Sequence, residues 1–266
     1  ALCFPPEHPF HHSLIGSMDD LSAASLEDVA EFFRTYYTPD NAVLSIAGDF
    51  DPATAMAPVE RHFGPIPRGA GRPPLPSMAV PSRFGSWTRD VVDDDVAAAR
   101  SFLAFRIPPC GDDAWYALSL LAAVLGSGEG ARLPRALLRE QRIASDAGAF
   151  TFDLTKGADL LICDATARSG VPLATLLEAV LRAVERLRRD GVTAAERDRA
   201  LALLEASWLL QLQSAGQRAD KLSQFATYFG DPRRVNDELA RYQAVTTAAL
   251  HAAARDWLGE DNRVSL

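Results

Sequence analysis

The tetrapeptide Asp40-Asn41-Ala42-Val43 is matched at three of its four positions by Asp261-Asn262-Arg263-Val264. The two copies are 261 − 40 = 221 residues apart, and the same offset aligns residues in the segments before them. The further aligned pairs are Arg34 with Arg255 and Tyr36 with Trp257. The repeat therefore predicts that the end of one folding unit occurs twice in this chain. A chance similarity between two short amphipathic helices is the alternative.

Each copy is expected to form a helix, a tight turn and a strand. In the first copy Ser25 is suited to cap the helix, with Asp28 at the position of a capping box. Apolar residues follow at helical spacing, and residues 42–47 are predicted to form a buried strand. In the second copy Thr246 or Thr247 can cap a helix of the same kind.

Composition limits the class of protein. The chain has 266 residues, of which 48% are hydrophobic and 23% are charged, so a soluble globular fold is expected. Its net charge of −8 argues against nucleic acid as a partner, because a phosphate-binding surface needs an excess of basic residues. No apolar run approaches the roughly 20 residues that cross a bilayer, so no membrane segment is predicted. The compartment is not determined, although the cytoplasm is favoured because no signal peptide pattern is visible.

The order of patterns along the chain predicts the fold class. Prolines are concentrated in residues 65–81, which is typical of a linker. Strand and helix patterns follow it, so we predict an α+β fold in which a mixed or antiparallel sheet is covered by helices. The predicted strands are residues 85–92, 99–107, 146–154 and 159–168, with a hairpin at Lys156-Gly157. The predicted helices are residues 114–125, 131–141, 193–213, 216–228, 232–242 and 246–257. Two more are predicted, one that begins at Pro52 with Asp51 as its cap and one that begins at Pro172 and carries an apolar stripe.

Several residue clusters could bind a ligand, but each has a simpler structural explanation. The glycine-rich loop 126–130 could approach a phosphate, yet no Lys-Ser or Lys-Thr follows it, which favours a helix-to-helix turn. His8 and His12 have the spacing of a metal-binding helix, but the neighbouring prolines favour a surface loop. The three cysteines lack the spacing of a zinc site or a disulfide framework. No metal ligand is therefore assigned in this chain.

A row of arginines is the remaining candidate site. Arg132, Arg135, Arg139 and Arg142 recur at helical spacing, so one face of the predicted helix 131–141 is basic. Such a row is usually a solvated face. The alternative is recognition of a carboxylate or of peptide carbonyls, which suit the donor fork of a guanidinium group.

Two blocks of the sequence resemble the pitrilysin/insulinase-type zinc metallopeptidases, including their mitochondrial processing relatives. The first block contains His8-Pro9-Phe10, Ile15-Gly16, Ser25-Leu26-Glu27-Asp28-Val29, Phe33, Tyr36-Tyr37, Pro39-Asp40-Asn41-Ala42-Val43, Gly48-Asp49-Phe50 and Phe63-Gly64-Pro65-Ile66-Pro67. The second contains Leu125-Gly126-Ser127-Gly128, Arg132-Leu133 and Leu138-Arg139-Glu140. The resemblance implies that each half of the enzyme has two homologous α+β domains. Two such halves, in one chain or as separate subunits, would enclose a chamber for extended peptides.

The resemblance also implies where zinc would bind. In this family an H-x-x-E-H motif and a later Glu bind zinc, and the motif Glu acts as general base. These 266 residues contain no H-x-x-E-H. If the second domain begins near Pro81, the offset places the start of the first at 81 − 221 = −140. We therefore expect a first domain that is truncated here, with its metal site outside this chain.

The expected domains follow from the same resemblance. Residues 1–66 would be the C-terminal remnant of a first peptidase-like domain, residues 67–80 a proline-rich linker, and residues 81–266 a complete, non-catalytic second domain. The segment itself would be inactive and without zinc, in a parent that is a zinc-dependent metalloendopeptidase. The alternative is a non-catalytic chamber-wall or assembly subunit, like the core-protein relatives of processing peptidases. The expected partners are a peptide substrate and a second peptidase half or homologous subunit.

One substrate contact is implied by the resemblance. Relatives have an Arg and a Tyr in the second domain that hold the peptide beside the zinc of the facing half. Arg139 occupies the Arg position, but Asp146 stands where the Tyr is expected. We therefore expect Arg139 to bind substrate, without the aromatic partner that the family pattern includes.

Overall fold

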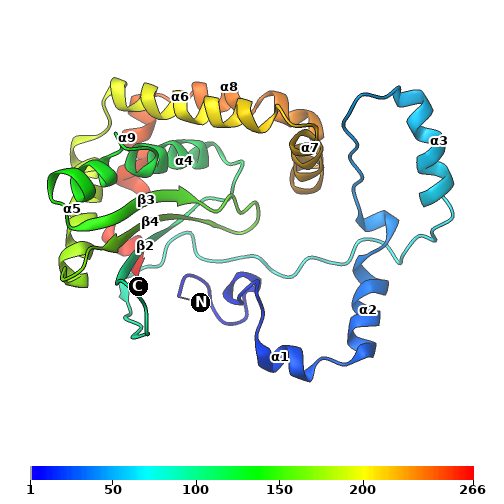
Figure 1. Ribbon diagram of the computed structural model, residues 1–266, viewed down its shortest axis with the longest axis horizontal. Helices are drawn as coiled ribbons and strands as arrows, with labels where there is room; N and C mark the ends of the chain where they lie inside the picture. The colour runs from blue at the N-terminus through cyan, green and yellow to red at the C-terminus, as the bar shows by residue number, and fades with distance from the viewer. Residues whose placement is uncertain (1) are drawn as a thin grey trace. The chain divides into compact units, whose positions relative to one another are not determined.

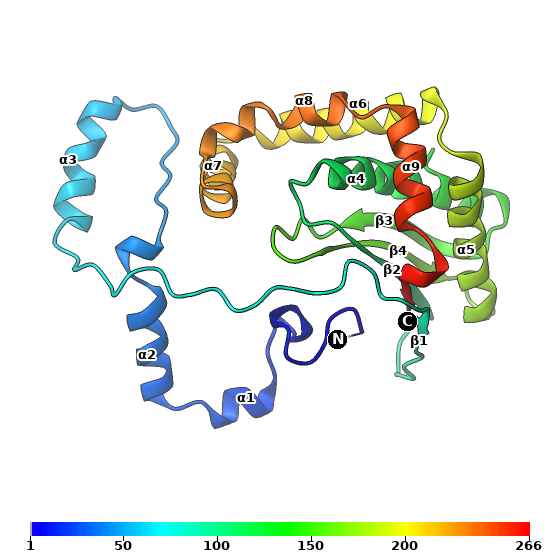
Figure 2. The same cartoon turned by 180° about the vertical axis from the view of Figure 1, so that it is seen from behind.

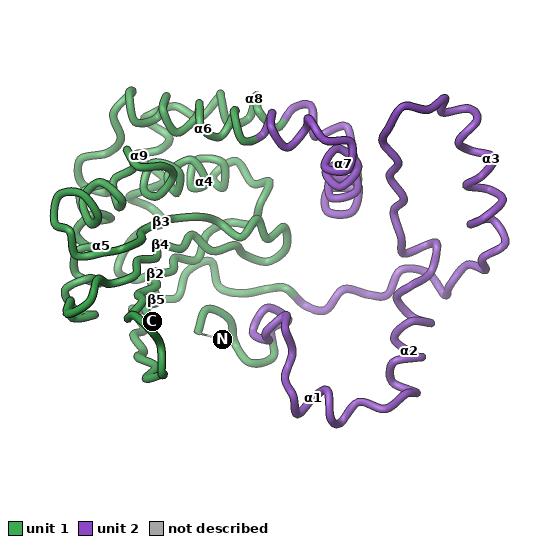
Figure 3. The backbone as a smooth tube through the Cα atoms, in the orientation of Figure 1, with its two compact units in different colours: residues 1–7, 78–207, 238–266 green, residues 8–77, 208–237 purple. Residues whose placement is uncertain are grey.

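The computed structural model describes residues 2–266, which fall into two compact units (Figure 3). Among the described residues, unit 1 is made of residues 2–7, 78–207 and 238–266, and unit 2 is made of residues 8–77 and 208–237. Each unit thus combines segments that are distant in the sequence.

Unit 1 is built around a five-stranded mixed sheet (Figures 1 and 2). Its strands are β1 (Thr88–Arg89), β2 (Arg100–Ile107), β3 (Ala144–Thr151), β4 (Asp159–Ala167) and β5 (Arg263–Ser265). They lie in the order β1-β5-β2-β4-β3; β1 and β5 are parallel, and all other neighbours are antiparallel. The hairpin predicted at Lys156-Gly157 joins β4 to β3, and Gly157 has the positive φ of 71° that favours glycine. The predicted α+β fold with a mixed sheet is confirmed.

Three helices of unit 1 pack on this sheet and form the main core with it. They are α4 (Asp113–Gly126), α5 (Leu173–Asp190) and α9 (Thr247–Trp257). Leu103 and Phe105 of β2 and Leu161 of β4 are fully buried in this core. Because its apolar residues recur at helical spacing, α5 buries one stripe from Leu176 to Leu187. The helices α6 (Ala194–Gln211) and α8 (Glu238–Gln243) complete the helical part, although the end of α6 extends into unit 2.

Unit 2 contains short helices and no strand among its described residues. Its elements are η1 (Pro9–His11), α1 (Met18–Ala23), α2 (Leu26–Tyr36), η2 (Pro39–Asn41), α3 (Pro52–Phe63), α7 (Ala215–Phe229) and η4 (Pro232–Asn236). α3 begins as its sequence requires, because Asp51 accepts a hydrogen bond from the Ala53 amide and Pro52 is the first helical residue. Across residues 2–266, no helix is long and apolar enough to span a membrane.

The two copies of the repeat have the same helix bounds once the offset is applied. α2 and α9 begin 247 − 26 = 221 residues apart and end 257 − 36 = 221 residues apart. Ser25 and Thr246 cap them, and each side chain accepts a hydrogen bond from the amide three residues later. A 3-10 turn follows both helices, at η2 in the first copy and at η5 (Glu260–Asn262) in the second.

The repeated asparagine makes the same hydrogen bond in both copies. Asn41 donates from Nδ2 to the Tyr36 carbonyl at 3.0 Å, and Asn262 donates from Nδ2 to the Trp257 carbonyl at 2.7 Å. Tyr36 and Trp257 are themselves related by the offset, and each is the last residue of its helix. The helix and turn of the repeat therefore form twice, as the sequence predicts.

Some predicted elements differ from the structure. Residues 42–47 form no strand, because no other strand is available beside them, whereas the second copy continues into β5 against β2. The predicted strand 85–92 is reduced to β1, which has only β5 to pair with. The predicted helix 232–242 is divided into η4 and α8 at Asp237. The predicted helix 131–141 is a π-helix, η3 (Pro134–Glu140), over most of its length.

Candidate functional site

The glycine loop 126–130 connects α4 to η3, and its glycines are required by close contacts. A Cβ atom on Gly126 would lie 1.8 Å from the amide nitrogen of Ala149 in β3. Gly128 has a φ of 76°, in the left-handed region that favours glycine. The loop therefore serves as the helix-to-helix turn, and it brings Glu129 toward the next helical segment.

The arginine row lies on and beside η3. The amide of Gln141 donates to the carbonyl of Ala136, five residues earlier, which is the hydrogen bond of a π-helix. Helices of this kind are rare and often occur at functional sites. Three of the four arginines form ion pairs with carboxylates: Arg132 with Glu196, Arg135 with Glu140, and Arg139 with Glu129. The basic face predicted from the sequence is thus largely neutralised.

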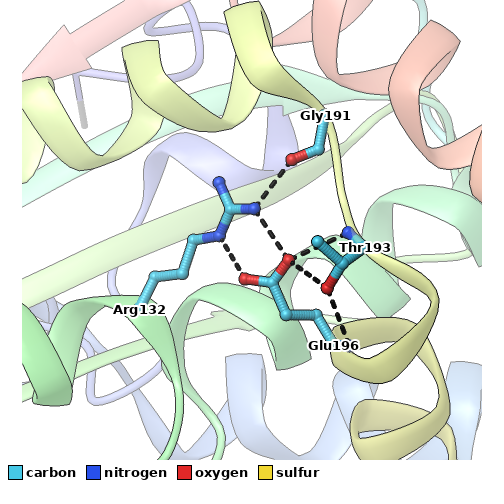
Figure 4. A network of polar contacts seen from close by, with 4 residues as sticks. All are labelled: Arg132, Gly191, Thr193 and Glu196. Carbon is cyan, nitrogen blue, oxygen red and sulfur yellow. Dashed lines mark hydrogen bonds and ion pairs between the residues drawn. The ribbon is translucent and has the colours of Figure 1, made fainter.

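Arg132 has a structural role (Figure 4). It donates from Nε and Nη2 to the two carboxylate oxygens of Glu196 at 2.7 and 2.9 Å, and from Nη2 to the Gly191 carbonyl at 2.7 Å. The hydrogen bonds from Arg132 lower the pKa of Glu196 to about 2. Glu196 also accepts from the Thr193 amide, in the capping box of α6. Arg132 therefore joins the start of η3 to the end of α5 and the start of α6.

A cavity of about 290 Å³ opens beside this network. Its lining residues are Arg132, Arg135, Ala136, Glu140, Ala183, Arg186, Asp190 and Glu196. Three arginines face three carboxylates there, so the cavity has no net charge with which to attract an anion.

Arg139 lies in the last turn of η3 with its side chain exposed. Its guanidinium donates to the Glu129 carboxylate, which comes from the glycine loop. Asp146, at the position where relatives have Tyr, is exposed on β3, and beside it Ser145 donates to the Thr166 carbonyl. The structure therefore leaves Arg139 accessible to a ligand and offers no aromatic ring at residue 146.

The described residues do not fit a zinc ion. Among residues 2–266, no three His, Cys, Asp or Glu side chains lie close enough together to hold a metal. His8 is buried and accepts a hydrogen bond from the Phe10 amide at Nδ1, at 3.1 Å, so it caps η1. It lies in neither a metal-binding helix nor an exposed surface loop, the two alternatives that the sequence suggested.

Three buried carboxylates, Asp159, Asp164 and Glu238, were not identified from the sequence. Asp159 is fully buried and accepts hydrogen bonds from the Trp115 indole and from the Leu160 amide, both at 2.7 Å. Burial raises the pKa of Asp159 to about 6. Glu238, also buried, accepts from the Tyr116 hydroxyl at 3.0 Å. For Asp159, the available signal was its position directly before the apolar run 160–163.

A match to a family model shows the class of protein to which the chain belongs. Residues 23–204 match the family model of the peptidase M16 inactive domain, and the chain belongs to that family. This family is the inactive-domain part of the pitrilysin/insulinase-type metallopeptidases, so the resemblance that the sequence suggested is confirmed.

Similar proteins are described as zinc proteases. The zinc protease PqqE of Helicobacter pylori is 28% identical over 222 residues, which are 83% of this chain and 49% of that protein. An uncharacterized zinc protease of Mycobacterium tuberculosis is 28% identical over 95% of this chain and 57% of its own length. The chain thus spans about half the length of the curated relatives that it matches.

Solved structures support the fold. The structure of a protease from Helicobacter pylori has a TM-score of 0.88 at 23% identity, over 97% of this chain and 62% of that one. A peptidase M16 inactive domain from Pseudomonas fluorescens has a TM-score of 0.77 at 19% identity, over 99% of this chain and 61% of that one.

Proposed function

We propose that the chain is a segment of a zinc-dependent metalloendopeptidase, and that the segment itself neither binds zinc nor cleaves peptides. The observation that carries this proposal is the family match over residues 23–204, together with relatives that are named zinc proteases and of which the match covers 49% and 57%. The metal ligands and the general base would belong to a part of the protein beyond these residues. In that protein zinc would activate the water that attacks the peptide bond.

The proposed domain organisation rests on the repeat. Residues 1–66 would be the end of a first peptidase-like domain, residues 67–80 a linker and residues 81–266 the second domain. In the second copy, β5 pairs with β2, and α9 packs against α4 and α5. The first copy has the same helix, cap and turn, so its apolar residues would be covered by a sheet and helices of the same kind outside residues 1–266.

The proposed ligand is an extended peptide, and the proposed partner is a second peptidase half or a homologous subunit. The net charge of −8 does not suit nucleic acid as a ligand. Arg139 is the candidate peptide contact, because its exposed guanidinium can donate two hydrogen bonds to carbonyl or carboxylate oxygens.

The absence of activity in the segment is tested by incubating the purified 266-residue chain with zinc and a quenched fluorescent peptide. We expect no metal-dependent cleavage by this chain, and zinc-dependent cleavage of the same peptide by the longer protein. Zinc-dependent cleavage by the segment that is abolished by a chelator would overturn the proposal.

The role of Arg139 is tested in the longer protein with a matched control. Arg139→Ala is expected to lower kcat/KM by roughly tenfold or more if a charge-assisted hydrogen bond to the peptide is lost. Arg135→Ala removes an exposed arginine that is paired in the same helix, and it should leave kcat/KM within about twofold. Equal effects of the two substitutions would assign Arg139 to the solvated face.

A second candidate function is a non-catalytic chamber-wall or assembly subunit. The specific observation that favours it is Asp146 at the Tyr position, since an acidic side chain cannot supply the aromatic contact. The sequence of the longer protein distinguishes the two candidate functions. A peptidase would contain an H-x-x-E-H motif, and a non-catalytic subunit would lack it.

A further inference from the structure

Glu129 differs from Glu140, the other acidic partner of an arginine on η3, because it lies in the loop before the helix. Arg135 pairs with Glu140, which lies at the end of the same helix. Arg139 instead pairs with Glu129, which lies between Gly128 and Gly130 in the loop before the helix. Among the described residues, Glu129 provides the one carboxylate that is paired with Arg139.

The loop that carries Glu129 is held in place by close contacts. A Cβ atom on Gly126 would overlap the main chain of Ala149, and one on Gly130 would lie 2.8 Å from the guanidinium of Arg199. Gly128 lies against Leu203, at 3.5 Å from where its Cβ atom would be. The backbone is therefore closely packed near Glu129, while the Glu129 side chain is 85% exposed. Rotation of this side chain, without movement of the loop, is sufficient to release Arg139.

We infer that Glu129 is a positioning residue that holds the Arg139 guanidinium until a peptide oxygen displaces it. This inference rests on the proposed function of Arg139. The incoming group would be a main-chain carbonyl or a terminal carboxylate, since both are acceptors that fit a guanidinium fork. Binding then exchanges one acceptor for another at Arg139, so Glu129 lowers the affinity of the peptide by the strength of its own ion pair.

The size of this effect follows from exposure. Both side chains are more than half exposed, and exposed ion pairs contribute little because solvent screens them. Removal of the Glu129 charge is therefore expected to tighten peptide binding by roughly two- to fivefold. Glu129→Asp shortens the side chain and should give an intermediate affinity.

The test uses the 266-residue chain labelled with ¹⁵N in its arginine side chains. N-acetyl-Ala-Leu-Ala with a free carboxylate is titrated into the wild type, Glu129→Gln and the control Glu140→Gln, and the Arg139 Nε signal is followed. The peptide is expected to bind about two- to fivefold more tightly to Glu129→Gln than to the wild type. Its affinity for Glu140→Gln should equal that for the wild type. An amidated peptide identifies the ligand group: binding only by the free acid indicates the carboxylate, and binding by both forms indicates the carbonyl.

The inference is overturned if Glu129→Gln and the wild type give the same Arg139 titration, or if no peptide perturbs the Arg139 signal in either protein. Because this titration needs no zinc and no cleavage, its outcome is separate from that of the activity test. A longer protein that cleaves peptides while Glu129→Gln has no effect here would leave the proposed function standing and remove only the role of Glu129.

Discussion

The two copies of the repeat have the same local structure but different surroundings. Val29, Phe33 and Val43 of the first copy are 46%, 51% and 38% exposed. Their counterparts at the offset of 221, Leu250, Ala254 and Val264, are 0%, 0% and 3% exposed. The first copy ends in an unpaired segment, whereas the second ends in β5, which lies between β1 and β2.

This difference distinguishes structure that forms from local sequence alone from structure that forms only beside a neighbouring element. Caps, helix bounds and the asparagine turn form in both copies, because each depends on residues within about ten positions. The strand forms only where β2 supplies hydrogen-bonding partners and where α4 and α5 cover the helix. An apolar face as exposed as that of α2 is typical of a surface that binds another protein segment.

The largest expected contrast is at the paired positions 29 and 250. Leu250→Ala removes a fully buried side chain from the core of unit 1 and is expected to lower the free energy of unfolding by about 2–5 kcal/mol. Val29→Ala changes a half-exposed side chain and should alter it by less than about 0.5 kcal/mol in this chain. Urea unfolding of both variants measures the difference, and similar losses would show that the first copy is also packed.

Substitution of the two repeated asparagines is expected to give a smaller difference in the free energy of unfolding. Asn262 is buried and donates to the Arg106 and Trp257 carbonyls, both at 2.7 Å, so Asn262→Ala leaves buried acceptors without a partner. We expect a loss of about 2–3 kcal/mol, against less than about 1 kcal/mol for Asn41→Ala, which removes one exposed hydrogen bond. Thermal unfolding of the two variants checks this, and a larger shift for Asn41→Ala would contradict the assigned roles.

Substitution of the two helix caps is expected to give the smallest difference in stability. Thr246→Ala is expected to destabilise unit 1 by about 1 kcal/mol, because α9 is part of its core. Ser25→Ala removes the same kind of hydrogen bond from α2, which has no buried residue. It should reduce the helix content of residues 26–36 without shifting the unfolding of unit 1. Circular dichroism and urea unfolding separate these results, and a global shift with Ser25→Ala would show that α2 and unit 1 unfold together.

The sequence predicted those parts of the fold that depend on short-range patterns. Ser25, Asp51 and the stripe of α5 were recognisable because capping and helical periodicity act over a few residues. The failure of residues 42–47 to form a strand was not predictable, since an apolar run shows that a segment can be buried and not whether a partner is present. Nor does the α-helical pattern of residues 131–141 distinguish an α-helix from the π-helix η3.

The candidate site shows the same limit. The role of Arg139 was predicted from the family resemblance. The spacing of the arginines predicted that they lie in a row, but it did not predict their ion pairs. Arg132 pairs with Glu196, which is 64 residues away, so its structural role depends on how α5 and α6 fold back toward η3. The buried pair of Asp159 and Trp115 likewise joins residues 44 positions apart. Contacts of this range follow from the tertiary fold and not from spacing.

Hydrogen exchange of residues 25–47, in this chain and in the longer protein, tests the account most directly. We expect the amides of residues 42–47 to exchange rapidly in the 266-residue chain and to be strongly protected in the longer protein, where a sheet would pair with them. Residues 263–265 serve as the internal reference and should be protected in both. Equal, rapid exchange of residues 42–47 in both proteins would contradict the claim that the first copy is the end of a first domain that folds like the second.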